Sequence, residues 1–94
     1  MSTATIKITS PSVGGTVNRP FVASGNFTFN GTPTISVVLR DSSGVTVATG
    51  ATPQLAGLAW SSTIAPTQAL TGASVFAQIV GTNANDTVTN VTVN

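Results

Sequence analysis

The sequence is almost without charge, and it lacks the residues that carry out most protein chemistry. Its 94 residues include three basic and two acidic side chains, and no His, Cys, Glu or Tyr. His, Cys and Glu supply most general bases, thiol nucleophiles and transition-metal ligands, so the composition argues against an enzyme and against any cofactor. Serines are plentiful, but Asp41 and Asp86 cannot form a catalytic triad without His.

The scarcity of charge also narrows the range of partners. Three basic residues are too few for the many phosphate contacts that nucleic-acid binding needs, and a net charge of +1 gives little electrostatic steering from Lys7 or Arg19. Apolar runs such as Val37-Val38-Leu39 fall far short of the roughly 18 residues of a membrane span. We therefore expect neither a nucleic acid nor a membrane as partner.

What the sequence has in quantity is β-branched residues, since Thr, Val and Ile make up 34 of its 94 residues. Such residues suit strands and are mediocre in helices. Apolar and polar residues alternate in stretches that are bounded by turn residues. These stretches predict strands within 5–9, 21–29, 34–40, 45–48, 58–64, 75–79 and 87–93, with an irregular segment or a short edge strand at 49–55. Seven strands at this spacing predict one domain over residues 1–94, an antiparallel β-sandwich, with a small β-barrel as the alternative.

The alternation also predicts which side chains face the core. The expected turns and corners are 30–33, 41–44, 66–72 and 81–86. Val88 is out of phase with the inward pair at the end of the chain, which indicates a β-bulge. The side chains expected to point inward are Ile35, Val37, Leu39, Val75, Ala77, Ile79, Val91 and Val93. In the other strands the alternation groups residues on one face: Ile6 with Ile8, then Phe21, Ala23, Gly25, Phe27 and Phe29, and then Leu58, Trp60, Ser62 and Ile64, of which Trp60 is expected in the core.

Several short motifs along nearly the whole chain resemble the bacterial immunoglobulin-like domain superfamily. The motifs are Ile8-Thr9-Ser10-Pro11 with Gly14-Gly15-Thr16-Val17, Phe21-x-Ala23-Ser24-Gly25, Gly57-x-x-Trp60-Ser61, Leu70-x-Gly72-Ala73-x-Val75-x-Ala77, and the final hairpin Asn83–Val93. The resemblance implies an immunoglobulin-like sandwich with a core Trp. The chain departs from the antibody type, because it has no Cys pair and no Tyr for a tyrosine corner.

Domains of this superfamily occur on bacterial surface proteins and on phage capsids, tails and fibres. A chain that begins with Met and shows no signal peptide fits the phage setting better. The resemblance thus predicts a non-enzymatic virion component, such as a capsid decoration protein, assembled in the host cytoplasm and bound to capsid or other virion proteins or to itself. The alternative is an extracellular adhesion or carbohydrate-binding module at a cell surface.

A candidate docking surface follows from the predicted faces. If Val37, Leu39, Val75, Ala77 and Ile79 point inward, then Val38, Phe76 and Val80 point outward. The third and sixth strands pair in an immunoglobulin-like topology, so these three residues would cluster on one outer face, with Val88 as a further candidate. A contiguous exposed apolar patch suggests an interface, whereas the competing interpretation shields Phe76 within the monomer.

Other candidate sites have simpler structural interpretations. Asp86 with Asn83 and Asn85 could offer oxygen ligands to Ca²⁺, but one carboxylate is a weak set, and a hairpin turn is the favoured interpretation. Arg40 and Asp41 could form a recognition pair, although solvated charges at a strand end are expected. Four N-glycosylation sequons, at Asn26, Asn30, Asn85 and Asn90, are attributed to the Ser and Thr content.

Trp60 has two possible roles. It could line a carbohydrate groove, as large aromatic side chains with a polar end do at exposed sites. Its alternation with Leu58 and Ile64 favours instead a core indole that packs between two sheets.

Overall fold

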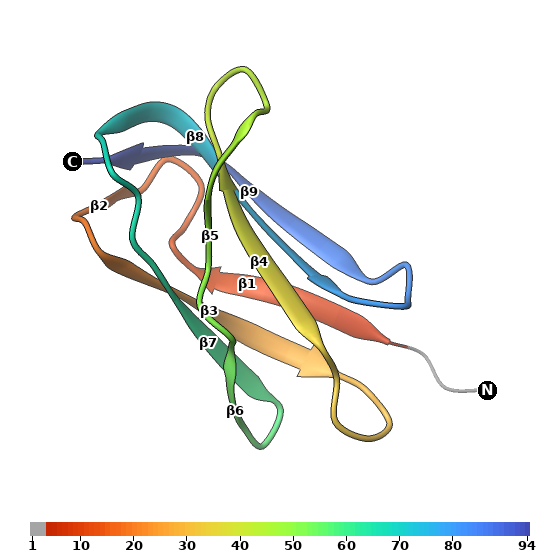
Figure 1. Cartoon of the computed structure of the whole chain (residues 1–94). Coiled ribbons are helices and arrows are strands. Elements are labelled where there is room, and N and C mark those ends of the chain that lie inside the picture. The colour runs from red at the N-terminus through yellow and green to blue at the C-terminus, as the bar shows by residue number, and fades with distance from the viewer. Residues whose placement is uncertain (1–3) are drawn as a thin grey trace.

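A computed structural model describes residues 4–94, which form two β-sheets packed face to face (Figure 1). One sheet has the order β1-β3-β7-β6 and the other β2-β9-β8-β4-β5; we call them the smaller and the larger sheet. The strands are β1 (Thr5–Ser10), β2 (Thr16–Val17), β3 (Phe21–Thr28), β4 (Ile35–Arg40), β5 (Thr46–Thr49), β6 (Gln54–Ala56), β7 (Ala59–Ile64), β8 (Leu70–Ile79) and β9 (Asn85–Val93).

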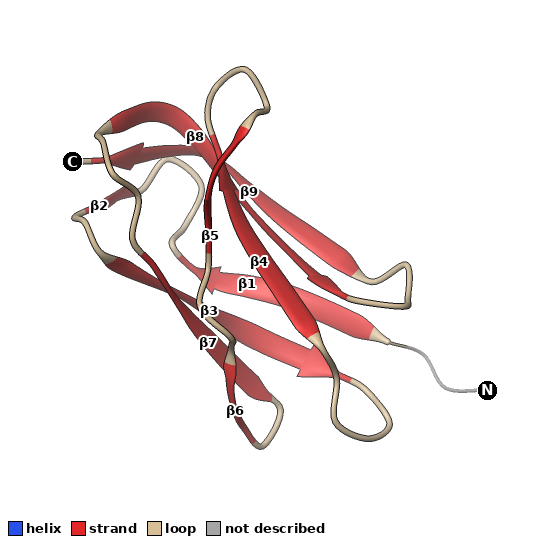
Figure 2. Cartoon of the chain, in the orientation of Figure 1, coloured by secondary structure: helices blue, strands red, loops and turns tan. Residues whose placement is uncertain are grey.

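Every regular element of residues 4–94 is a strand (Figure 2). The predicted all-β sandwich is therefore confirmed, and the two separate sheets make it an open sandwich rather than the alternative small barrel. No part of the described chain forms a helix with the length and apolar character needed to cross a membrane.

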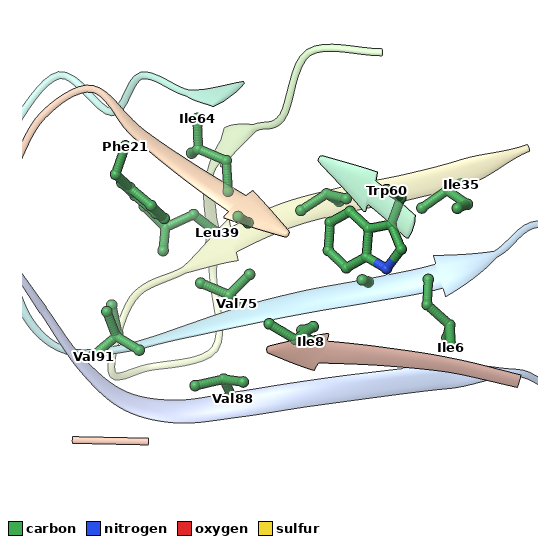
Figure 3. Packing of buried hydrophobic residues seen from close by; sticks show 14 of the residues in the cluster. Ile6, Ile8, Phe21, Ile35, Leu39, Trp60, Ile64, Val75, Val88 and Val91 are labelled. Atoms are coloured by element: carbon green, nitrogen blue, oxygen red, sulfur yellow. The ribbon is translucent and has the colours of Figure 1, made fainter. Parts of the chain in front are cut away.

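The predicted alternation is confirmed in the long strands. In β3 and β4, every second residue is buried from Phe21 to Phe27 and from Ile35 to Leu39. The buried side chains of the two sheets meet in one core, part of which Figure 3 shows. This core contains Ile6, Ile8, Phe21, Ala23, Phe27, Ile35, Val37, Leu39, Trp60, Ile64, Ala73, Val75, Ala77, Ile79, Val88, Val91 and Val93.

The indole of Trp60 lies between the sheets and is 2% exposed (Figure 3), which confirms the core interpretation. Its register partner on β3 is Gly25. A Cβ atom at Gly25 would lie 2.9 Å from the indole Nε1 and would collide with the backbone carbonyl oxygen of Lys7. The missing side chain at Gly25 therefore makes room both for Trp60 and for the close approach of β1.

The chain crosses from the larger to the smaller sheet between Gly50 and Ala51. The amide of Gly50 donates to the carbonyl oxygen of Val37 in the larger sheet at 2.7 Å. The next amide, that of Ala51, donates to the carbonyl oxygen of Thr63 in the smaller sheet at 2.9 Å. The hydroxyl of Ser62, the one buried polar side chain among the described residues, donates to the Ala51 carbonyl at 2.6 Å. This bond ties the crossing segment to β7 and explains a serine at an inward position.

The predicted bulge in the last strand is confirmed, but Val88 lies in the core rather than beside the outer-face residues. Val88 pairs with Val75 and Val91 with Ala73, so β9 advances three residues while β8 advances two. The extra residue is accommodated near Asn90, whose φ is 60°. Because the bulge reverses the alternation, Val88 turns inward and is 5% exposed.

The structure contradicts the placement of Leu58 on the same face as Trp60. Leu58 is 60% exposed, in the tight turn between β6 and β7. Gly57 takes a φ of 62° in this turn, and Ala56 pairs directly with Ala59. The alternation of β7 therefore begins only at Ala59. The prediction was wrong because it included Leu58, a residue of the hairpin turn, in the strand.

Several boundaries also differ from the sequence prediction. β8 begins at Leu70, inside the predicted corner, because Leu70 pairs with Val93 at the end of β9. β9 begins at Asn85, inside the predicted turn. β2 was not predicted, since two residues are too few to show alternation; it runs parallel to β9, with Val17 beside Val93.

Candidate docking face on the larger sheet

Val38 of β4 and Phe76 of β8 are direct register partners on the outer side of the larger sheet. Both are half-buried, and each is flanked by a threonine: Thr49 of β5 beside Val38, and Thr87 of β9 beside Phe76. The four side chains form a row across the sheet, with the apolar pair at its centre. Few charged residues lie near them, Arg40 being the closest in the register.

The guanidinium group of Arg40 lies over the ring of Phe76, with its Cζ 4.6 Å from the ring centroid. Arg40 and Phe76 project from the same side of neighbouring strands, since Arg40 pairs with Ser74, two residues before Phe76. A cation at this distance is attracted by the face of the ring. Arg40 is therefore half-buried as a cover for Phe76, rather than a freely solvated charge at a strand end.

Val80 lies apart from this pair. It follows β8, is 48% exposed, and donates its amide to the carbonyl of Thr34 at 2.8 Å. The polar pair Ser36–Gln78 lies between Val80 and the Val38–Phe76 pair. The structure thus brings Val38 and Phe76 together and places Val80 at the end of the same face.

Both carboxylates of the chain bind backbone amides. Asp41 accepts from Ser43 at 2.9 Å and from Val45 at 3.0 Å, which closes the β4–β5 loop. Asp86 accepts from Thr87 at 3.0 Å and, through its other oxygen, from Ile8 at 2.8 Å. Ile8 belongs to β1 of the smaller sheet, so Asp86 joins the two sheets, a role that its position in a predicted turn did not suggest.

The neighbouring candidates have local roles. Asn83 and Asn85 sit at the β8–β9 connection, where the Asn85 side chain donates to the Asn83 carbonyl at 3.0 Å, as the turn interpretation expects. Within residues 4–94, no group of three or more His, Cys, Asp or Glu side chains is placed to hold a metal ion. Arg19 donates to the carbonyl of Asn94 at 2.6 Å, and Lys7 is exposed on the smaller sheet.

The two sheets, with β2 and β9 parallel and the other pairs antiparallel, define an immunoglobulin-like β-sandwich. Solved structures show the same fold. Domain I10 of titin is 13% identical with a TM-score of 0.53, and the match covers 99% of this chain and 100% of that domain. An engineered protein is 23% identical with a TM-score of 0.62; the match covers 98% of this chain but only 20% of the engineered one.

The sequence comparisons add no family to this structural likeness. No model of a known protein family matches the chain, and no curated protein sequence matches it either. At identities this low the solved structures show the fold alone.

Proposed function

We propose that this domain is a non-enzymatic binding module that docks on a larger protein assembly through the outer face of its larger sheet. The observation that carries the proposal is the Val38–Phe76 pair at the centre of a face whose neighbouring side chains are mostly uncharged. Burying such a face would desolvate few charges, and the aromatic ring would supply a central anchor. Arg40 can keep its contact with Phe76 and offer hydrogen bonds to the partner.

The assembly we propose is a phage capsid, which the protein would decorate and stabilise, or on which it would be displayed. This setting is supported by the sequence resemblance to domains found on phage particles. The chemistry of the chain agrees with a role that needs no catalysis, because Asp41 and Asp86 are both committed to backbone amides. Self-association through the same face is the other form that docking could take.

Co-sedimentation with phage particles tests the proposal. Purified protein is mixed with gradient-purified particles of the phage that carries its gene, and the pellet is assayed for bound protein. We expect the wild type to sediment with the particles, and Phe76→Asp to lose at least about tenfold in affinity because a carboxylate replaces the apolar anchor. Circular dichroism and thermal melting should show that this variant remains folded.

Val22→Asp is the matched control for the charge. Val22 is an exposed apolar residue on the outer face of the other sheet, so the same charge is introduced away from the proposed contact. It should bind like the wild type. Equal binding by wild type and Phe76→Asp would contradict docking through the larger sheet, and failure of the wild type to bind would contradict the capsid setting.

A further inference from the structure

The outer face of the smaller sheet, on the opposite side of the molecule from the proposed docking face, contains a shallow cavity of about 410 Å³. Residues of β1, β3, β6 and β7 line it. Two neighbouring rows of outward side chains form its floor. One row is Ser24, Ser61 and Gln54, and the other is Asn26, Ala59 and Ala56, each running from β3 through β7 to β6.

The hollow follows from side-chain size. Four of the six side chains are small: Ser61 and Ala59 in the middle of the two rows, and Ser24 and Ala56 at one end of each. The two long side chains, Asn26 on β3 and Gln54 on β6, lie at diagonally opposite corners. Between them the sheet surface is uncovered, and the volume falls in the range of small-molecule sites, about 300–1,000 Å³.

The lining combines polar and apolar groups and contains no charged residue. Ser24, Ser61, Asn26 and Gln54 offer hydroxyl and amide groups, and the methyl groups of Ala56 and Ala59 form an apolar strip beside them. None of these four polar side chains is hydrogen-bonded to another described residue; the Thr9 hydroxyl bonds only the backbone carbonyl of Ser24, at 3.3 Å. Their donors and acceptors therefore face solvent and are free for a ligand.

We propose that this cavity binds a neutral saccharide. A sugar ring presents hydroxyl groups at its edge and aliphatic C–H groups on its face, which match the amides and hydroxyls and the alanine strip. A carboxylate or phosphate ligand would call for a cation at the centre of the lining. The nearest cation, Lys7, is the register partner of Asn26 on β1, so it borders the cavity beside Asn26 but lines a neighbouring hollow of about 270 Å³ that shares only Asn26 with this one. The indole of Trp60 plays no part, because it points into the core.

Amide chemical shifts measured during titration with neutral trisaccharides test this site. Maltotriose, cellotriose, mannotriose and triacetylchitotriose serve as neutral probes for the ¹⁵N-labelled protein, and trigalacturonic acid serves as an acidic comparison. We expect at least one of the neutral probes to cause saturable shifts centred on Ser24, Asn26, Gln54 and Ser61. The dissociation constant should be about 1 mM, as for a ligand held by a few hydrogen bonds in an open site.

The double variant Asn26→Ala/Gln54→Ala removes both long amides and should weaken this binding by about tenfold. Gln78→Ala/Asn85→Ala is the matched control, since these two residues are register partners on the larger sheet; it should bind as the wild type does. Phe76→Asp should also keep its sugar affinity, which separates this site from docking on an assembly.

Three results would overturn the proposal. The first is that none of the four neutral trisaccharides causes saturable shifts. The second is that the shifts map to the larger sheet, or fall equally in both double variants. The third is that only acidic sugars bind, which would assign recognition to Lys7 instead of the neutral lining.

Discussion

The two sheets use their aromatic side chains in opposite ways. The smaller sheet turns Phe21, Phe27 and Trp60 into the core. The larger sheet lines its inner side with aliphatic residues and Ala, and places its one aromatic residue, Phe76, on the outside. The aromatic rings of the smaller sheet thus pack against mainly aliphatic side chains of the larger sheet in one close-packed core.

The two aromatic side chains depend on neighbouring residues in different ways. The inward indole of Trp60 needs space, and the adjacent strand β3 provides it at Gly25. An outward ring needs cover from water, and Arg40 of the neighbouring strand provides it. The first arrangement bears on stability and the second on the surface presented to partners, so substitutions at the two places should differ greatly in effect.

The largest effect is expected from Gly25→Ala. The new Cβ would collide with the Lys7 carbonyl and press on the indole of Trp60, so β1 must shift away from β3. We expect the free energy of unfolding to fall by about 3 kcal/mol, as for an overpacked core. Urea denaturation monitored by Trp fluorescence measures this loss, since the indole is the reporter in the affected contact.

Gly81→Ala is the control for the loss of glycine itself. Gly81 has a φ of 87° and nothing within 4 Å of an added Cβ, so only backbone strain is introduced. That strain should cost about 1 kcal/mol. If Gly25→Ala costs no more than Gly81→Ala, the space at Gly25 is not what holds Trp60 in place.

Much of this architecture can be predicted from period-two alternation. The inward sets of β3, β4 and the second half of β8 are fixed by alternating apolar residues, and the bulge before Val91 shows as a break in phase. The pattern fails where a strand is too short or a turn is itself apolar. β2 has two residues, and Leu58 extends the pattern of β7 into a turn.

The candidate site was predicted only in part. Alternation alone places Val38 and Phe76 on the outer side, but their direct pairing depends on the register of β4 and β8, which no local signal fixes. The cover by Arg40 depends on the same register. Asp86 was missed because its partner, the amide of Ile8, is 78 residues away in the sequence.

An intermediate effect is expected from Asp86→Ala, which tests whether the two sheets act as separate layers. The substitution leaves the part-buried amide of Ile8 without its acceptor, and an unsatisfied buried donor costs about 2 kcal/mol. Asp41→Ala is the matched control, because Asp41 also accepts from two backbone amides, but only within its own exposed loop. We expect that change to cost about 0.5 kcal/mol.

Hydrogen exchange locates the effect of Asp86→Ala. The amide of Ile8 should exchange faster in this variant and should be largely protected again in Asp86→Asn, whose side-chain oxygen can still accept. Equal loss of stability in Asp86→Ala and Asp41→Ala, with unchanged exchange at Ile8, would mean that the contact between the sheets contributes nothing.

The smallest effect is expected from Arg40→Ala, which uncovers Phe76. An exposed cation–π contact is worth about 0.5–1 kcal/mol, so the loss should be of that size. A double-mutant cycle with Phe76→Leu isolates the contact, because leucine keeps the apolar bulk but has no ring for the cation. The stabilities of the two single variants and the double variant should give a coupling of about 0.5 kcal/mol. A coupling of zero would mean that Arg40 merely lies near the ring, and the outward aromatic would then need no cover from its own sheet.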